Sequence, residues 1–293
     1  MAVLQQDRVI RGQSSEGLRM VRSVAHLQVA ISVRDFLAMA TQPFPVLCDL
    51  DGVIWLAHQP IEGSARAVSR LRDAGHRVLF VTNNSASVVA DQQQALEHIG
   101  IPADGDILTS AMAAALLVQP GDHVLVCGGP GIVEALNSRG AVCAVAGPFD
   151  AVMVGFHRTF NYEVMRVASD AARAGARLLA TNDDATYPTP DGLIPGGGAI
   201  LAGIAVASGM TPIVAGKPYG PMADLVRREL GGIDMSSAVM VGDRPETDGL
   251  FARTLGCRYA HVWSGVTPHG TDVVPIPDLT GANLAAIADA LLR

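Results

Sequence analysis

Two segments of the sequence carry carboxylates at spacings that suit a metal site. Asp49 and Asp51 follow the apolar run 44–48, and Asp243 and Asp248 lie in the segment GDRPETD after a second apolar run. Residues two apart in an extended chain point the same way, so Asp49 and Asp51 can converge. Carboxylates held close together repel unless a cation, a shared proton or strong donors compensate. Because oxygen ligands of this kind suit Mg²⁺, the pattern predicts a magnesium site.

Two further segments supply a hydroxyl group and a cation. Thr82 and Asn83 follow the apolar run 78–81, and Lys217 follows the run 213–215. One carboxylate can attack phosphorus while a second protonates the leaving oxygen and later activates water. A metal ion and a lysine can neutralise the phosphoryl oxygens, which a hydroxyl group and amides hold. Together the four segments favour phosphoryl transfer.

All four segments stand where an expected strand ends. Short apolar runs alternate with helical segments from residue 44 onward, which implies right-handed crossovers and a largely parallel sheet. Ligands of such α/β folds bind beyond the carboxyl ends of the strands. Strands are expected at 44–48, 78–81, 124–127, 151–155, 177–181, 213–215 and 238–241, and helices at 62–74, 87–98, 109–118 and 162–174.

Composition excludes several classes of protein. The chain has 293 residues, of which 49% are hydrophobic and 17% charged, so a large core is expected and global disorder is not. The net charge of -7 gives no basic face for nucleic acid, although a bound metal would still permit an anionic substrate. No apolar run has the length of a membrane span. We therefore expect neither a nucleic-acid nor a membrane partner.

The four cysteines predict a reducing environment. They are Cys48, Cys127, Cys143 and Cys257, and none forms a CxxC pair that would indicate zinc or redox chemistry. Their positions in apolar segments are typical of buried free thiols. We expect a cytoplasmic protein.

Residues 1–39 carry the least information. Arginines flank a short apolar stretch, 24–33, that is too polar for a secretory signal, and the acidic residues nearby disfavour a transit peptide. Two interpretations stay open: a poorly ordered extension, or an overlong gene model whose true start is Met39. The second is preferred because a strand-like run begins soon after Met39.

The motifs DLDGV at 49–53, VTNNS at 81–85, GKP at 216–218 and GDRPETD at 242–248 resemble the four ordered motifs of the haloacid dehalogenase (HAD) superfamily. Their spacing is similar to that of subfamily IIA, the NagD-like, p-nitrophenyl phosphatase and phosphoglycolate phosphatase group. The resemblance runs from about Phe44 to Thr267 and includes TSAMA, GFHRTFNY, ATNDD and PGGGA. It implies a Rossmann-like core with a parallel sheet at 40–123 and 213–293, and an inserted α/β C2-type cap at 124–212.

The same resemblance implies roles for the core residues. Asp49 would be the nucleophile that forms an aspartyl-phosphate, and Asp51 the general acid and base. Thr82 and the amide of Asn83 would hold the phosphoryl oxygens, and Lys217 would pair with Asp49 and the phosphate.

The implied magnesium ligands are Asp49, Asp243 and the main-chain carbonyl of Asp51. Asp248 would act through bound water or by orienting its neighbours, although it could instead cap the helix that follows. In the cap, residues in matching segments are implied to contact the substrate; they are Arg158, Asn182, Asp183 and Tyr187. Many relatives have proline at the position of Asp183, which leaves the shape of that loop open.

The sequence therefore predicts a Mg²⁺-dependent phosphatase of small phosphate monoesters, such as glycerol 3-phosphate or 2-phosphoglycolate. Alternatives are a nucleotide or pyridoxal phosphate phosphatase, phosphotransfer to an alcohol instead of water, and a non-catalytic protein that binds phosphometabolites. The complete set of ionisable residues speaks against the last. Since some relatives dimerise through the cap, a homodimer is a further expectation.

Overall fold

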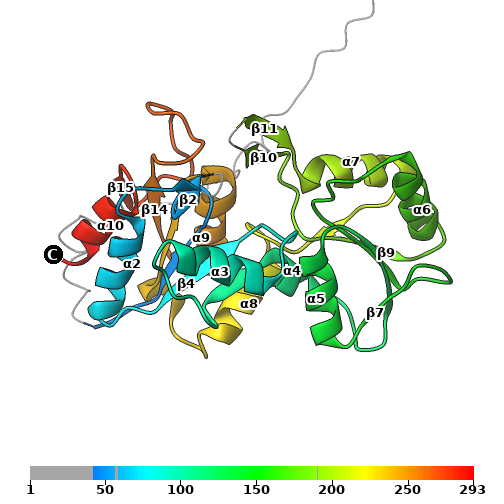
Figure 1. Ribbon diagram of the computed structural model, residues 1–293, viewed down its shortest axis with the longest axis horizontal. Helices are drawn as coiled ribbons and strands as arrows, with labels where there is room; N and C mark the ends of the chain where they lie inside the picture. The colour runs from blue at the N-terminus through cyan, green and yellow to red at the C-terminus, as the bar shows by residue number, and fades with distance from the viewer. Residues whose placement is uncertain (1–41, 57–58, 190) are drawn as a thin grey trace, which may run out of the picture. The chain divides into compact units, whose positions relative to one another are not determined.

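The computed structural model describes residues 42–56, 59–189 and 191–293 (Figure 1). The extension predicted at 1–39 and the start at Met39 lie outside these residues. Within the described residues, no helix combines the length and the apolar character that crossing a bilayer requires.

The first and last thirds of the described chain contribute the strands of a six-stranded parallel sheet. Its strand order is β15-β14-β13-β1-β4-β5, and every neighbouring pair is parallel. The bounds are β1 Val46–Cys48, β4 Val78–Thr82, β5 Ile107–Thr109, β13 Val239–Gly242, β14 Arg258–Val262 and β15 Leu279–Gly281. Because β1 is flanked by β13 and β4, the carboxyl ends of these three strands are adjacent.

Helices cover both faces of this sheet, and the alternation of side chains along each strand decides which face they meet. Leu47 packs into the apolar cluster of α4 Ser110–Ala115, α8 Gly220–Glu229 and α9 Leu250–Leu255. Its neighbours Val46 and Cys48 pack into the cluster of α2 Ser64–Asp73, α3 Val89–His98 and α10 Leu284–Leu291. Burial on both faces explains why the strand sequences are apolar throughout.

A second parallel sheet lies in the segment predicted to be the cap. Its five strands follow the order β12-β9-β8-β6-β7. They are β6 His123–Cys127, β7 Val142–Cys143, β8 Ala151–Val154, β9 Arg177–Ala180 and β12 Ile213–Val214. The predicted boundary at residue 213 falls at the start of β12, an edge strand of this sheet, because Ile213 and Val214 pair with β9.

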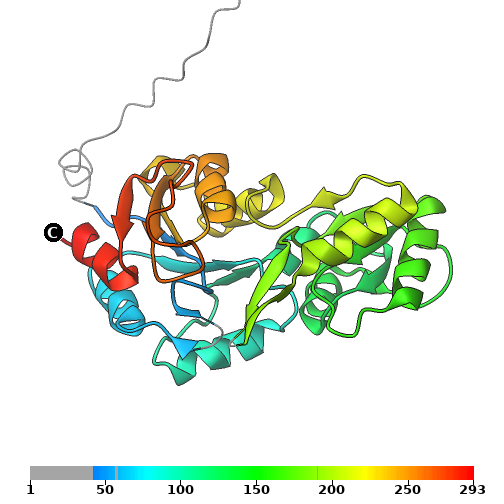
Figure 2. The ribbon, with the colours of Figure 1, turned by 90° about the horizontal axis from the view of Figure 1, so that it is seen from above.

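The helices α6 Tyr162–Arg173 and α7 Gly197–Ser208 pack side by side on one face of the second sheet (Figure 2). The other face carries α5 Pro130–Arg139 and joins the same apolar cluster as Leu47 of the first sheet. Met153 of β8 and Leu79 of β4 are both members of this cluster. The two sheets therefore share one continuous apolar core.

The α/β class and the parallel sheet predicted from the sequence are confirmed. Two antiparallel hairpins were not predicted: β2 Trp55–Leu56 with β3 Gln59–Pro60, and β10 Thr186–Thr189 with β11 Gly192–Pro195. All four strands are short, and three of them contain proline or glycine, so they lack the apolar runs that revealed the parallel strands. All four cysteines are free thiols; three are buried as expected, and Cys143 is partly exposed.

Candidate active site

Three aspartates meet at the carboxyl ends of β1 and β13. Asp49 continues β1, where its amide donates to the carbonyl of Val241 at 2.9 Å, and Asp243 directly follows β13. One carboxylate oxygen from each of Asp49, Asp243 and Asp248 lies within 4.8 Å of the others. Gly52, with φ of 87°, allows this approach, because a Cβ there would overlap the Asp243 carboxylate.

Lys217 bridges two of these aspartates. It is the only lysine in the sequence and is 1% exposed. Its Nζ donates to Asp49 Oδ1 at 2.8 Å and to Asp248 Oδ1 at 2.7 Å. Burial by itself would lower the pKa of Lys217, but the charges of Asp248 and Asp49 outweigh it and raise that pKa. The amine therefore stays protonated at neutral pH.

The cluster holds more negative charge than one lysine compensates. Burial raises the pKa of Asp49 well above its usual value, with Lys217 opposing and Asp248 adding to the rise. Burial, and then the charge of Asp248, raise the pKa of Asp243 to about 7. Asp243 Oδ2 accepts from the amide of Val266 at 2.7 Å, whereas the buried Oδ1 has no hydrogen-bond partner among the described residues. An all-oxygen donor set with an unpartnered buried oxygen fits a hard divalent cation.

Asp248 is fully buried in the π-helical turn η2 Pro245–Gly249. Its Oδ2 accepts from the amide of Arg244 at 3.1 Å, and its Oδ1 accepts from Lys217. Gly249, not Asp248, occupies the N-cap position of α9. The Asp248 carboxylate thus faces Lys217 and the other aspartates and does not cap α9.

The loop after β4 ties the site to the segment predicted to be the cap. Asn83 Oδ1 accepts from the amide of Lys217 at 2.8 Å, and Asn83 Nδ2 donates to the Lys217 carbonyl at 3.0 Å and to Asp184 Oδ2 at 2.9 Å. The Asn83 carbonyl accepts from Asn182 Nδ2 at 2.9 Å. Thr82 Oγ1 accepts from the amide of Asn84 at 3.0 Å, which leaves its hydroxyl hydrogen available to a ligand.

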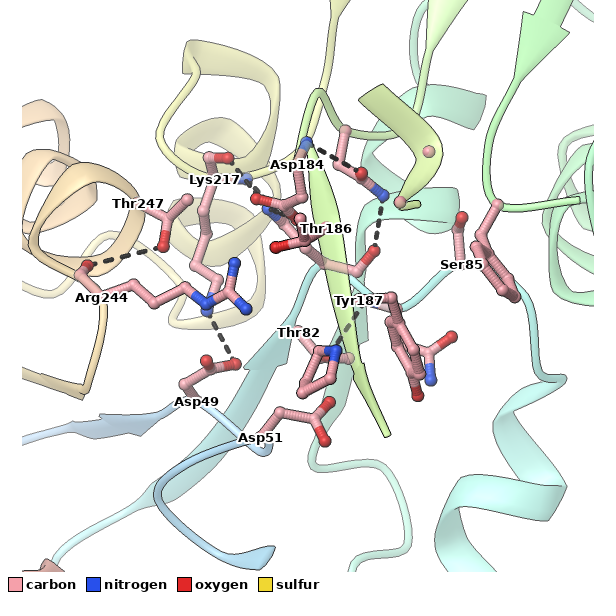
Figure 3. Close-up of a pocket in the computed structure, with 17 residues that line it drawn as sticks. Asp49, Asp51, Thr82, Ser85, Asp184, Thr186, Tyr187, Lys217, Arg244 and Thr247 are labelled. Carbon is pink, nitrogen blue, oxygen red and sulfur yellow. Dashed lines mark hydrogen bonds and ion pairs between the residues drawn. The ribbon is translucent and has the colours of Figure 1, made fainter. Parts of the chain in front are cut away.

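These groups enclose a cavity of about 60 Å³. Asp49, Asp51, Thr82 and Lys217 line it, with Asp51 half-buried (Figure 3). The predicted phosphate-binding and acid–base residues thus face the same space.

Of the predicted substrate-binding residues in the cap, the structure brings two to the cavity. Asn182 and Tyr187 line it. The Tyr187 ring stacks on Phe156 with centroids 5.2 Å apart, and burial, with the charge of Asp51, raises the pKa of the Tyr187 hydroxyl to about 12. Asp183 is exposed, lies outside the cavity lining and accepts a hydrogen bond from the hydroxyl of Tyr219. Arg158 is also exposed and outside the lining.

Several residues that line the cavity were missed by sequence reasoning. Arg244 and Thr247 belong to GDRPETD, and Asp184 follows Asp183 in ATNDD. The motifs therefore include these residues, but nothing in the sequence marks them as residues that line the cavity. Burial raises the pKa of Asp184, while the hydrogen bond from Asn83 and the charge of Arg244 oppose that rise. Phe156, with no charge to mark it in the sequence, forms part of the apolar wall.

Comparisons with known proteins agree with this arrangement. Residues 46–142 match the family described as haloacid dehalogenase-like hydrolase, and residues 214–287 match one described as HAD-hydrolase-like. The acid sugar phosphatase of Staphylococcus saprophyticus is 34% identical over 225 residues, which are 75% of this chain and 86% of that protein.

Solved structures resemble the fold as well. The glycerol phosphate phosphatase of Mycobacterium tuberculosis in complex with magnesium is 32% identical, with a TM-score of 0.77 over 86% of this chain and 77% of that one. The p-nitrophenyl phosphatase of Archaeoglobus fulgidus is 28% identical, with a TM-score of 0.77 over 84% of this chain and 98% of that one.

Proposed function

The chain belongs to the haloacid dehalogenase-like hydrolases, in the NagD-like group of phosphoric monoester hydrolases, and we propose that it hydrolyses small phosphate monoesters through an aspartyl-phosphate on Asp49. This membership confirms the resemblance predicted from the four motifs. One observation carries the proposal: carboxylate oxygens of Asp49, Asp243 and Asp248 lie within 4.8 Å of one another beside a buried lysine.

In the first step, a carboxylate oxygen of Asp49 bonds to phosphorus while the bond from phosphorus to the ester oxygen breaks. Lys217, which contacts Asp49 Oδ1 at 2.8 Å, favours the ionised form of the carboxylate and orients it. Asp51 lines the same cavity and gives its proton to the leaving oxygen, so that the product leaves as an alcohol.

In the second step, Asp51 takes a proton from water and the water oxygen bonds to phosphorus. The bond between phosphorus and Asp49 breaks, which releases inorganic phosphate and restores the carboxylate. The hydroxyl of Thr82, the amide of Asn83 and the amine of Lys217 hold the phosphoryl oxygens through both steps.

The side chains of Asp49 and Asp243, with the main-chain carbonyl of Asp51, would hold Mg²⁺. When bound, the ion neutralises charge on the phosphoryl oxygens and on the carboxylates. Asp248 acts through water or by orientation, because its two oxygens already accept from Lys217 and from the amide of Arg244. The buried Asp243 Oδ1, which lacks a hydrogen-bond partner among the described residues, supports this assignment.

The size of the cavity favours a small leaving group. Its volume of about 60 Å³ is far below the ~300–1,000 Å³ of sites for drug-sized ligands. Glycerol 3-phosphate and 2-phosphoglycolate are therefore preferred over nucleotides and pyridoxal phosphate. A relative that is named as a glycerol phosphate phosphatase supports the same class. A cytoplasmic location and a homodimer through the cap stay predictions.

Release of p-nitrophenol from p-nitrophenyl phosphate tests the proposal. We expect turnover with Mg²⁺, none with EDTA, and none in Asp49→Asn, whose far-UV circular dichroism should match the wild type. Asp224→Asn on the exposed surface of α8 is the matched control and should retain full activity. Absence of turnover by the wild type across a broad panel of phosphomonoesters with Mg²⁺ would refute the proposal and favour a binding protein.

A further inference from the structure

Two cationic side chains line the cavity, and of the two only Lys217 forms ion pairs with described residues. Lys217 contacts Asp49 and Asp248. The guanidinium of Arg244 forms no hydrogen bond or ion pair with any residue in the described part of the chain, although it is half-buried and lines the cavity. A guanidinium held in a cavity with its five donors free is suited to bind an anion.

The backbone of Arg244 is fixed while its side chain extends into the cavity. Its amide donates to Asp248 Oδ2 at 3.1 Å, and its carbonyl accepts from the amides of Asp248 at 2.7 Å and Thr247 at 3.2 Å. From this anchored turn, the guanidinium reaches toward the centre of the cavity (Figure 3). The position is therefore set by the same turn that places Asp248.

The location of the guanidinium indicates which part of a substrate it meets. The scissile phosphoryl group has Lys217, Thr82 and the amide of Asn83 as donors on the side of the six-stranded sheet. The charge of Arg244 lowers the pKa of Asp184 in the ATNDD loop and also that of Asp243 beside the phosphoryl-binding residues, so the guanidinium lies between these two parts of the site. Beyond the phosphoryl-binding residues, the cavity is lined by this loop and by Thr186 and Tyr187, which leaves this part of the cavity for the leaving group.

We propose that Arg244 binds a carboxylate on the leaving group, so that the site selects phosphorylated hydroxy acids over phosphorylated alcohols of the same length. A carboxylate matches the planar fork of a guanidinium with two parallel hydrogen bonds. The cavity is small, at about 60 Å³, so a compact planar carboxylate is favoured over a bulkier second phosphate group. This inference rests on the proposed phosphatase function.

Asp184 does not oppose such a ligand strongly. Its Oδ2 already accepts a hydrogen bond from Asn83 Nδ2 at 2.9 Å, and burial raises the pKa of its carboxyl. Asp184→Asn should therefore leave the preference for a carboxylate unchanged or increase it. If Asp184 itself determined substrate choice through hydroxyl groups, the same substitution would abolish turnover of the alcohol phosphate.

A matched pair of substrates distinguishes recognition of the leaving group from recognition of the phosphoryl group. 2-Phosphoglycolate and 2-hydroxyethyl phosphate have the same number of carbons and differ in the carboxylate. We expect the wild type to favour 2-phosphoglycolate in kcat/KM. In Arg244→Gln, kcat/KM for 2-phosphoglycolate should fall about 10- to 100-fold, chiefly through KM, whereas 2-hydroxyethyl phosphate and p-nitrophenyl phosphate should change less than about 3-fold.

Two further variants complete the test. Arg244→Lys keeps the charge but loses the fork and should show an intermediate loss on 2-phosphoglycolate. Arg228→Gln on the exposed face of α8 is the matched control and should change neither substrate. Thermal unfolding of each variant identifies any loss of folding.

Four results would overturn the inference. Equal losses on all three substrates in Arg244→Gln would show that the guanidinium binds the phosphoryl group. No loss on any of them would show that it does not contact the substrate, and a wild type without preference for 2-phosphoglycolate would remove the basis for selection. A wild type that hydrolyses none of the three with Mg²⁺ would refute the phosphatase function and this inference with it.

Discussion

Replacement of Lys217 by methionine tests how far the charge cluster governs the stability of the fold. Methionine has a similar length and no charge, so Lys217→Met removes both ion pairs without creating a large cavity. Lys217 is 1% exposed, and its partners Asp49 and Asp248 are also buried. The substitution leaves three buried carboxylates, including Asp243, with no cation among the described side chains within ion-pair distance.

The structure sets the size of the expected effect. Loss of one partner of a buried ion pair costs about 3–5 kcal/mol, because the remaining charge stays buried and uncompensated. Lys217 serves two partners, at 2.8 and 2.7 Å, so the upper part of that range is expected for metal-free protein at pH 8. At pH 5 the loss should be smaller. The pKa values of Asp49 and Asp243 are already raised in the folded protein, and protonation removes the repulsion.

Urea unfolding followed by far-UV circular dichroism measures this loss as a change in midpoint at constant m. It should be recorded at pH 5 and pH 8, with EDTA and with saturating Mg²⁺, since a bound divalent cation replaces part of the missing charge. The double variant Lys217→Met/Asp248→Asn should recover part of the loss, because one of the uncompensated charges is gone. Catalysis should be lost in either variant.

If Lys217→Met lowers the free energy of unfolding by less than about 1 kcal/mol at pH 8 in EDTA, the reasoning is refuted, because an exposed ion pair would cost that little. A loss that is the same at pH 5 and pH 8 would refute it as well. Failure of the double variant to recover any stability would show that the cost arises from packing around residue 217 and not from charge.

Two other predictions concern the same site. The pKa of Asp243 is raised to about 7 in the metal-free fold, so the stability contributed by its protonated form is present below pH 4 and lost as pH rises through about 7. The increase in Tm that Mg²⁺ produces should therefore be larger at pH 8 than at pH 5, and differential scanning fluorimetry showing an equal increase would contradict this. Asn83→Ala should lower kcat/KM and reduce the free energy of unfolding by about 1–3 kcal/mol, because it removes the side-chain bonds to Lys217 and Asp184. The exposed Asn137→Ala on α5 serves as its control, and an equal, small effect of both would reject the role of Asn83.

Much of the cluster could be predicted from the sequence because its members stand at the ends of apolar strands. In a parallel sheet the carboxyl ends of neighbouring strands share one edge, so Asp49, Thr82 and Asp243 had to be near one another once β4, β1 and β13 were adjacent. Nothing in the local sequence determines that adjacency. The four ordered motifs predicted it through resemblance to a family with this topology.

The remaining residues of the site depend on loop conformation, which apolar periodicity does not encode. Asp183 and Asp184 are chemically identical neighbours, and the turn in which the amide of Asp184 donates to Asn182 Oδ1 at 3.3 Å directs only the second of them into the cavity. Loop conformation also decides which of Arg158 and Arg244 reaches the cavity. The first lies in an exposed segment, whereas the second is placed by the hydrogen bonds of a single buried turn.

The distribution of charge explains why one arginine remains available in so acidic a site. Lys217 neutralises part of the charge on Asp49 and Asp248, and a divalent ion bound at Asp243 would neutralise most of the rest. If Arg244 were also paired with an aspartate, the cavity would hold no cation for the ligand beyond those that hold the phosphoryl group. The turn at 244–248 instead directs the main chain of Arg244 to Asp248 and its side chain to the cavity, so one short segment both orients a carboxylate and presents a free guanidinium to the substrate.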